Sequence, residues 1–99
     1  MYIVSVLYPK GDFDLDYYRQ SHLPLVDRLL TPEGMSEMAY WQPTEDAPDA
    51  PFQLIAELRF ADAETAGKAL ALHGKTTQDD IPNFTSVTPL ILTGTLRAG

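Results

Sequence analysis

Cysteine is absent from this chain of 99 residues, which excludes disulfides, thiolate catalysis and thiolate metal sites. Positive charge is scarce, because 7 lysines and arginines stand against 14 aspartates and glutamates, for a net charge of −7. Binding to nucleic acid or to an anionic membrane needs cations that face phosphates, so neither partner is expected. No apolar run approaches the roughly 20 residues that span a bilayer, and no signal peptide is recognised. The sequence therefore predicts a soluble, cytoplasmic protein.

The length predicts a single domain over residues 1–99. A hydrophobic share of 44% and a charged share of 21% are ordinary for a globular protein. Folding of so short a chain leaves a small net stability, on the order of 5–15 kcal/mol. A partner subunit would add to that stability.

Hydrophobic periodicity predicts four strands and two helices. We expect strands over residues 2–8, 35–42, 52–60 and 87–96, and helices over residues 14–30 and 63–72. The order β-α-β-β-α-β with right-handed crossovers gives an α+β, ferredoxin-like fold. That fold is a four-stranded antiparallel sheet with both helices on one face.

Breaks in the pattern predict where these elements bend or end. Pro24 has no N–H for the carbonyl of Gln20, so the first helix should kink or be interrupted there. His73 and Gly74 should end the second helix, where the helix dipole favours a histidine and glycine is a common cap. The acidic, proline-rich loop over residues 43–51 should be exposed and mobile.

The first and last strands are apolar on both faces, although the helices can cover only one face of the sheet. Soluble monomers rarely leave a large apolar surface in water. A second copy of the chain, packed face to face, is the simplest cover. The sequence therefore predicts a homodimer.

His22 lies within the apolar stripe of the first helix, one turn after Tyr18. A buried imidazole needs a hydrogen-bond partner, because an unpaired polar group costs about 1–3 kcal/mol. One interpretation is a core histidine bonded to a backbone carbonyl, such as that of Gln20. The other is a side chain that takes or gives a proton near neutral pH. The spacing leaves both interpretations open.

Several aromatic residues could form a binding site. Tyr18 and Tyr40 could present hydroxyls to a ligand in an apolar cavity, and Trp41, on the other face of its strand, is a further aromatic candidate. The alternative is core packing with the hydroxyls bonded to backbone. Tyr17 points to the polar side of the helix and is expected on the surface.

The loop before the last strand adds a few candidates. Asp80 could orient His22 or act as a base, although adjacent aspartates such as Asp79 and Asp80 usually form a solvated turn. Asn83 and Phe84 could shape the same loop.

Familiar cofactor and metal motifs are absent. The chain has no Gly-x-Gly-x-x-Gly or Walker loop, so nothing supports the binding of nucleotide phosphates. Its two histidines, His22 and His73, with scattered carboxylates, match no metal-ligand spacing. The serines lack the context of a nucleophile elbow. No cofactor and no metal are expected.

Two segments resemble the EthD family, and the resemblance extends over essentially the whole chain. The first segment matches the family's helix-one signature with Phe13-Asp14-x-x-Tyr17-Tyr18-x-x-x-His22-x-Pro24-Leu25-Val26. The second matches the approach to the family's last strand with Asp80-Ile81-Pro82-Asn83-Phe84-Thr85. The resemblance implies a dimeric α/β-barrel, in which two ferredoxin-like sheets pack face to face and each subunit has a pocket between sheet and helices.

The resemblance also implies roles for single residues. His22 matches the motif histidine, which implies an acid/base residue, and Tyr18 matches the aromatic residue before it, in the pocket wall. Asp80, Asn83 and Phe84 match the second motif, for which a structural role is an alternative. Reactions of relatives that use a cysteine are not available to this chain.

The resemblance leads to two main hypotheses for function. EthD relatives include muconolactone isomerases and small dehydratases or decarboxylases, and the wider superfamily includes cofactor-free monooxygenases and haem-degrading enzymes. The first hypothesis is therefore a small cofactor-independent enzyme that moves a proton on a small apolar, aromatic or lactone substrate through His22. The alternative is a non-catalytic binding or accessory protein of a degradation or biosynthetic pathway. Haem binding through His22 or His73 is a third hypothesis, by analogy with distant superfamily members. The expected substrate-binding residues are Tyr18, Tyr40, Trp41, Asp80 and Phe84.

Overall fold

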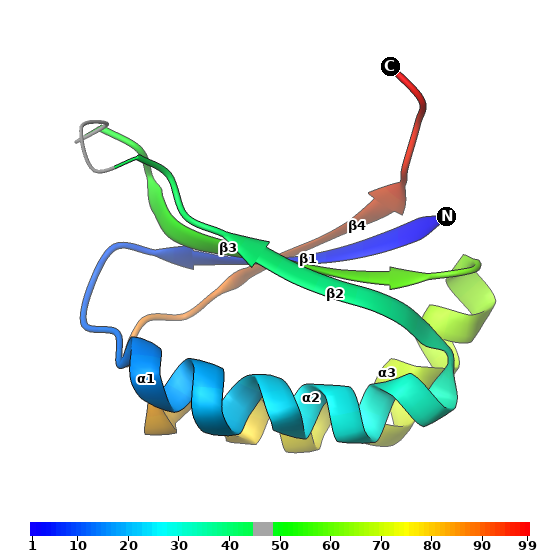
Figure 1. The fold of residues 1–99 in the computed structure, drawn as a ribbon, viewed down its shortest axis with the longest axis horizontal. Coiled ribbons are helices and arrows are strands. Elements are labelled where there is room, and N and C mark those ends of the chain that lie inside the picture. Colours follow the sequence, from blue (N-terminus) through cyan, green and yellow to red (C-terminus); the bar gives the residue numbers. More distant parts are fainter. Residues whose placement is uncertain (45–48) are drawn as a thin grey trace.

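The computed structural model describes residues 1–44 and 49–99, and its core element is an antiparallel sheet with helices on one face (Figure 1). The sheet has the strand order β2-β3-β1-β4. Its strands are β1 (Tyr2–Pro9), β2 (Met35–Trp41), β3 (Phe52–Phe60) and β4 (Leu90–Thr95). The helices are α1 (Leu15–Tyr17), a π-helical turn (Tyr18–His22), α2 (Leu23–Leu30) and α3 (Ala63–Asp79). Short 3₁₀ turns cover Thr31–Glu33 and Ile81–Asn83. The ferredoxin-like fold predicted from the periodicity is confirmed.

The pairing of β1 with β3 and β4 sets the face that packs on the helices. Val4 pairs with Leu58 on one side and with Thr93 on the other, so these side chains share a face. The same face carries Phe60, which is fully buried. Phe60 belongs to the same hydrophobic cluster as Leu30, at the end of α2. Alternate residues of β1 and β3 therefore form the core, as the period of two predicts, whereas every residue of β4 is exposed.

The first helical segment is interrupted where the sequence predicts. The Asp14 carboxylate caps α1 by accepting the Tyr17 N–H at 3.0 Å. The Leu23 N–H then donates to the Tyr18 carbonyl, five residues back, instead of to a carbonyl four residues back. Pro24 follows at once and has no N–H to donate. The missing donor explains why the backbone widens into a π-turn at this point.

The second long helix differs from the prediction. It runs to Asp79, seven residues beyond Leu72, and Gly74 lies inside it. Among the described residues only Gly34 has a positive φ, at 109°, so Gly74 is not the left-handed cap that the sequence suggested. Gly74 is buried, and the Thr77 hydroxyl donates to its carbonyl at 2.9 Å. The sequence did not predict the last part of α3, because the residues after His73 are mostly polar and lack a helical hydrophobic period.

The start of the last strand and the loop over residues 43–51 also bear on the predictions. The last strand begins at Leu90 rather than at residue 87, because Pro89 offers no N–H to the sheet. The loop over residues 43–51 includes residues 45–48, which lie outside the described residues, and its expected mobility stays a prediction. No helix in the described part of the chain has the length and apolarity that crossing a membrane requires.

The sheet face opposite the helices, here called the outer face, is covered by no helix or strand of residues 1–44 and 49–99 (Figure 1). Three large apolar side chains on it are about half exposed: Trp41 at 53%, Leu90 at 49% and Leu92 at 53%. Glu37 and Arg59 lie on the same face and form an ion pair at 3.5 Å. The outer face therefore combines apolar and charged groups, and water contacts side chains that a core would bury.

Candidate functional site

A cavity of about 350 Å³ lies between the helix-facing side of the sheet and the helices α2 and α3. Its wall is largely apolar, with side chains such as Val4, Val26 and Leu58. The polar residues that line it are Tyr8, Tyr18, His22, Lys75, Thr77 and Gln78. The volume is at the lower end of the range for ligand pockets, so the cavity suits a small, mostly apolar molecule.

His22 is the buried imidazole of the cavity wall, with 5% of its surface exposed. It is the last residue of the π-turn. Its Nδ1 lies 2.9 Å from Oδ2 of Asp80, which comes directly after α3. This pairing occupies one ring nitrogen and leaves Nε2 for a ligand. The carboxylate takes the place of the backbone carbonyl of Gln20 that one interpretation of the sequence suggested.

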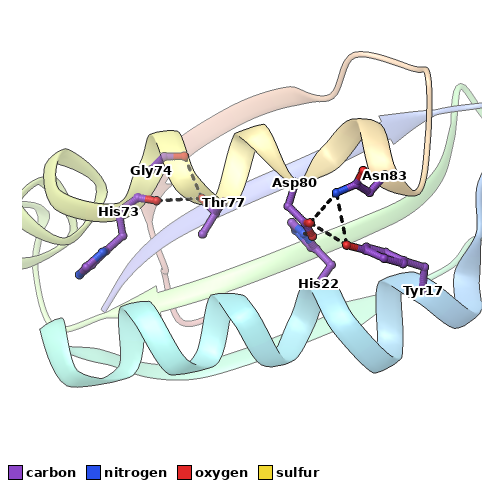
Figure 2. A network of polar contacts seen from close by, with 7 residues as sticks. All are labelled: Tyr17, His22, His73, Gly74, Thr77, Asp80 and Asn83. Carbon is purple, nitrogen blue, oxygen red and sulfur yellow. Dashed lines mark hydrogen bonds and ion pairs between the residues drawn. The ribbon is translucent and has the colours of Figure 1, made fainter.

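Asp80 is held by three side chains at once (Figure 2). Its Oδ1 accepts the Tyr17 hydroxyl at 2.8 Å and the Asn83 side-chain amide at 3.0 Å. The same amide also reaches the Tyr17 hydroxyl at 3.3 Å. Figure 2 shows Tyr17 and His22 approaching from the first helical segment, while Asp80 and Asn83 approach from the end of α3. The carboxylate therefore has a fixed position and a fixed orientation.

The electrostatics of the pair favour a neutral imidazole beside an ionised carboxylate. Burial lowers the pKa of His22 below its ordinary value of 6.5, against the opposing hydrogen bond and charge of Asp80. Burial alone would raise the pKa of Asp80, but hydrogen bonds from Asn83, His22 and Tyr17 hold it below its ordinary value. At neutral pH the Nδ1–H therefore donates to Asp80, and Nε2 carries a free lone pair. That is the protonation state of a general base.

Two neighbouring aromatic rings pack against the imidazole. The ring of Tyr18 stacks on that of His22 with centroids 5.5 Å apart and planes 21° apart. Phe84, which is 3% exposed, lies 4.6 Å from the imidazole centroid. Tyr40 meets Tyr18 edge to face at 5.6 Å. These ring contacts, together with the bond to Asp80, restrain the orientation of the imidazole.

The structure brings together most of the residues that the sequence singled out. His22 and Tyr18 line the cavity. Asp80 and Phe84 lie behind His22 and contact it directly, while Tyr40 lies behind Tyr18. These three support the wall without lining it.

Trp41 is the exception among the expected site residues. It is paired with Ile55 on the outer face of the sheet and is half exposed. Trp41 was expected to bind substrate, but this placement puts it outside the cavity. Neighbouring residues of a strand point to opposite faces, so Tyr40 and Trp41 cannot both face the helices.

Tyr17 was expected on the surface, but it is half-buried and bonded to Asp80. The expectation assumed 100° per residue along a regular helix. A turn closed by a bond between residues five apart brings Tyr17 and His22 to the same side instead. Pro24 was the signal that could have revealed this change of register.

Other side chains fall outside the cavity. His73 lies inside α3 rather than at its end, with Nε2 3.9 Å from the Glu33 carboxylate. Asp79 is exposed and bonds Lys75 at 2.7 Å. In residues 1–44 and 49–99 no group of three or more metal-ligating side chains is close enough to hold a metal ion.

Comparison with known families finds one match, over residues 12–88, to the model described as the EthD domain. No curated protein sequence matches the chain. Among solved structures, an EthD-like protein from Ralstonia eutropha JMP134 is similar, with 26% identity and a TM-score of 0.80, over 94% of this chain and 88% of that one.

Two more distant structures share the fold. One is SnoaB from Streptomyces nogalater, described as a cofactor-independent oxygenase, with 13% identity and a TM-score of 0.68, over 99% of this chain and 93% of that one. The other is a dimeric ferredoxin-like protein from an uncultured marine organism, with 12% identity and a TM-score of 0.60, over 100% and 97%.

Proposed function

The chain belongs to the EthD family, and from this premise we propose that it is a small cofactor-independent enzyme whose His22 moves a proton on a small, largely apolar substrate. Aromatic ring compounds and lactones are the proposed substrates, and isomerisation, dehydration or decarboxylation the proposed reactions. The protein would act as a single domain over residues 1–99. One observation carries the proposal: His22 bonds Asp80 at 2.9 Å through Nδ1 at the wall of an apolar cavity.

The proposed chemistry uses the free nitrogen of His22. Nε2 accepts a proton from a carbon next to a carbonyl, and the electron pair of that C–H bond forms an enolate. Asp80 stabilises the imidazolium that results, because its carboxylate already accepts the Nδ1–H. The imidazolium then returns the proton to the substrate. A buried site favours this step because water does not compete for the base.

Cofactor-free oxygenation is a related possibility, suggested by the fold shared with SnoaB. The non-catalytic alternative uses the same cavity, and it predicts binding without proton transfer.

Deuterium exchange separates the enzyme from the binding protein. We would incubate cyclohexanone, acetophenone and γ-butyrolactone with the protein in D₂O and follow the loss of the protons next to the carbonyl by NMR. Exchange faster than in buffer supports an enzyme, whereas binding without added exchange supports a binding protein.

Filling the cavity should weaken binding and slow exchange. Gly74 lines the cavity, so Gly74→Leu places a branched side chain in a space of about 350 Å³. We expect the affinity for the same ketones to fall by about tenfold or more, because a pocket ligand buries most of its surface. Gly67→Leu is the matched control, since that glycine lies in the same helix with open space beside it. Equal binding by the two variants would contradict the proposed location of the site.

We further propose that two copies pack through their outer faces as a homodimer. Trp41, Leu90 and Leu92 support this assembly because each is about half exposed. The fold shared with a dimeric ferredoxin-like protein also supports it. Cytoplasmic location remains part of the proposal, supported by the lack of cysteine in so small a domain.

Light scattering tests the dimer. We expect a mass near twice the 11.0 kDa of one chain. Leu92→Glu should shift the mass toward one chain, because it adds like charges to a face that meets its own copy. Leu72→Glu makes the same change on α3, at a residue that is 63% exposed, and should leave the dimer intact. A wild-type protein with the mass of a single chain would overturn the assembly.

A further inference from the structure

Tyr8 and Tyr18 are two deeply buried phenols in the wall of the cavity, each with only 1% of its surface exposed. Neither hydroxyl makes a hydrogen bond to the residues that the structure describes. Among the described residues, every fully enclosed side-chain oxygen has a hydrogen-bond partner. The two hydroxyl oxygens therefore touch open space, and the space available to them is the cavity.

An unpaired buried hydroxyl is costly, because losing its hydrogen bonds to water costs about 1–3 kcal/mol. A ligand in the cavity that carries a hydrogen-bond acceptor would supply the missing partner. Tyr8 stands on β1, in the sheet wall, with its ring 6.0 Å from that of Tyr18 on the helical wall. Tyr18 in turn stacks on His22. The cavity wall thus carries two hydrogen-bond donors in contact with each other, one of which also contacts the base.

We propose that the Tyr8 hydroxyl, together with that of Tyr18, donates hydrogen bonds to a carbonyl oxygen of the substrate while Nε2 of His22 takes a proton from the neighbouring carbon. This inference rests on the proposed function and adds Tyr8, which no sequence motif indicated. It also names the substrate class as uncharged carbonyl compounds that can form an enolate. Among the described residues of the wall, Lys75 is the side chain with a full charge, and Asp79 already neutralises it.

The proton and electron balance is complete without an oxidant or reductant. The C–H bond breaks, its proton goes to Nε2, and its electron pair forms the carbon–carbon double bond. The π pair of the carbonyl moves to oxygen, where the two phenols stabilise the negative charge. Burial raises the pKa of both phenols above the ordinary 10.0, so they stay protonated and keep donating. Return of the proton to a different carbon gives an isomer of the substrate.

Tyr8→Phe tests the inference because it removes only the hydroxyl and keeps the ring in the aromatic cluster. We expect it to slow deuterium exchange into acetophenone, cyclohexanone or γ-butyrolactone by about 10²–10³, the usual cost of one lost oxyanion donor. Tyr2→Phe removes a hydroxyl from the same strand, outside the cavity, and should leave exchange unchanged. The infrared carbonyl stretch of the bound ketone provides a second readout. It should lie at lower frequency in the wild type than in Tyr8→Phe.

The outcomes separate this inference from the proposed function. Exchange that is fast in the wild type and equally fast in Tyr8→Phe overturns the role of Tyr8 and leaves His22 as the base. Exchange that is no faster than in buffer overturns the proposed enzyme. In that case the carbonyl stretch of the bound ketone tests the role of Tyr8. A lower frequency in the wild type than in Tyr8→Phe supports Tyr8 as a hydrogen-bond donor. Equal frequencies in the two proteins overturn that role. Failure of all three carbonyl compounds to bind also overturns the inference.

Discussion

His22→Ala is expected to lower the rate of deuterium exchange by about 10²–10⁴, the usual contribution of a positioned general base. The structure supports so large an effect because His22 is the buried imidazole of the cavity and its Nδ1 is held at 2.9 Å by Asp80. Tyr8 and Tyr18 remain in the variant, but phenols with a raised pKa cannot replace a neutral imidazole as base. NMR detection of proton loss from the ketone measures the rate.

His73→Ala is the matched control, because it removes the same type of side chain from α3 outside the cavity. Thermal unfolding of both variants shows whether each remains folded. Exchange that survives in folded His22→Ala at the wild-type rate would remove His22 from the mechanism.

Asp80→Asn should lower the rate of deuterium exchange by a similar factor to His22→Ala, about 10²–10⁴, although the side chain keeps its size. Two donors, from Tyr17 and Asn83, point at Oδ1 of Asp80. An amide at this position must turn its oxygen toward them and its NH₂ toward His22. The Nδ1 atom then becomes an acceptor, and the ring proton moves to Nε2. The nitrogen that faces the ligand can no longer accept a proton.

Asp79→Asn provides the control for lost charge, since Asp79 is the neighbouring carboxylate and bonds the exposed Lys75. We expect exchange in this variant to match the wild type. If Asp80→Asn and Asp79→Asn had equal activity, Asp80 would not set the tautomer of His22. The charge of Asp80 opposes the lowering of the His22 pKa, so Asp80→Asn should lower that pKa further.

Much of the fold follows from local patterns in the sequence. The period of two in residues 52–60 and the helical period in residues 14–30 identify the layers, and the uncovered outer face follows from their order. The Asp80–His22 pair could not be derived from spacing, because 58 residues separate the two. Only the tertiary packing of α3 against the first helical segment brings them together.

The positions that sequence reasoning missed have specific physical causes. Tyr17 turns toward Asp80 because the π-turn changes the helical register. Lys75 and Gln78 reach the cavity because α3 continues through Gly74. Tyr8 looked like an ordinary core residue of a strand, and only its unpaired hydroxyl at the cavity distinguishes it.

The most direct test of the account is the ¹⁵N NMR titration of the two imidazoles, assigned with His22→Ala. We predict that His22 titrates below its ordinary pKa of 6.5, with the proton on Nδ1 and a bare Nε2 at neutral pH. Since the folded state resists protonation of His22, the unfolding free energy should fall as the pH drops below about 6.5. Acetophenone should shift the Nε2 resonance. A titration at or above 6.5, with the proton on Nε2 and no response to the ketone, would contradict the assignment of His22 as the base.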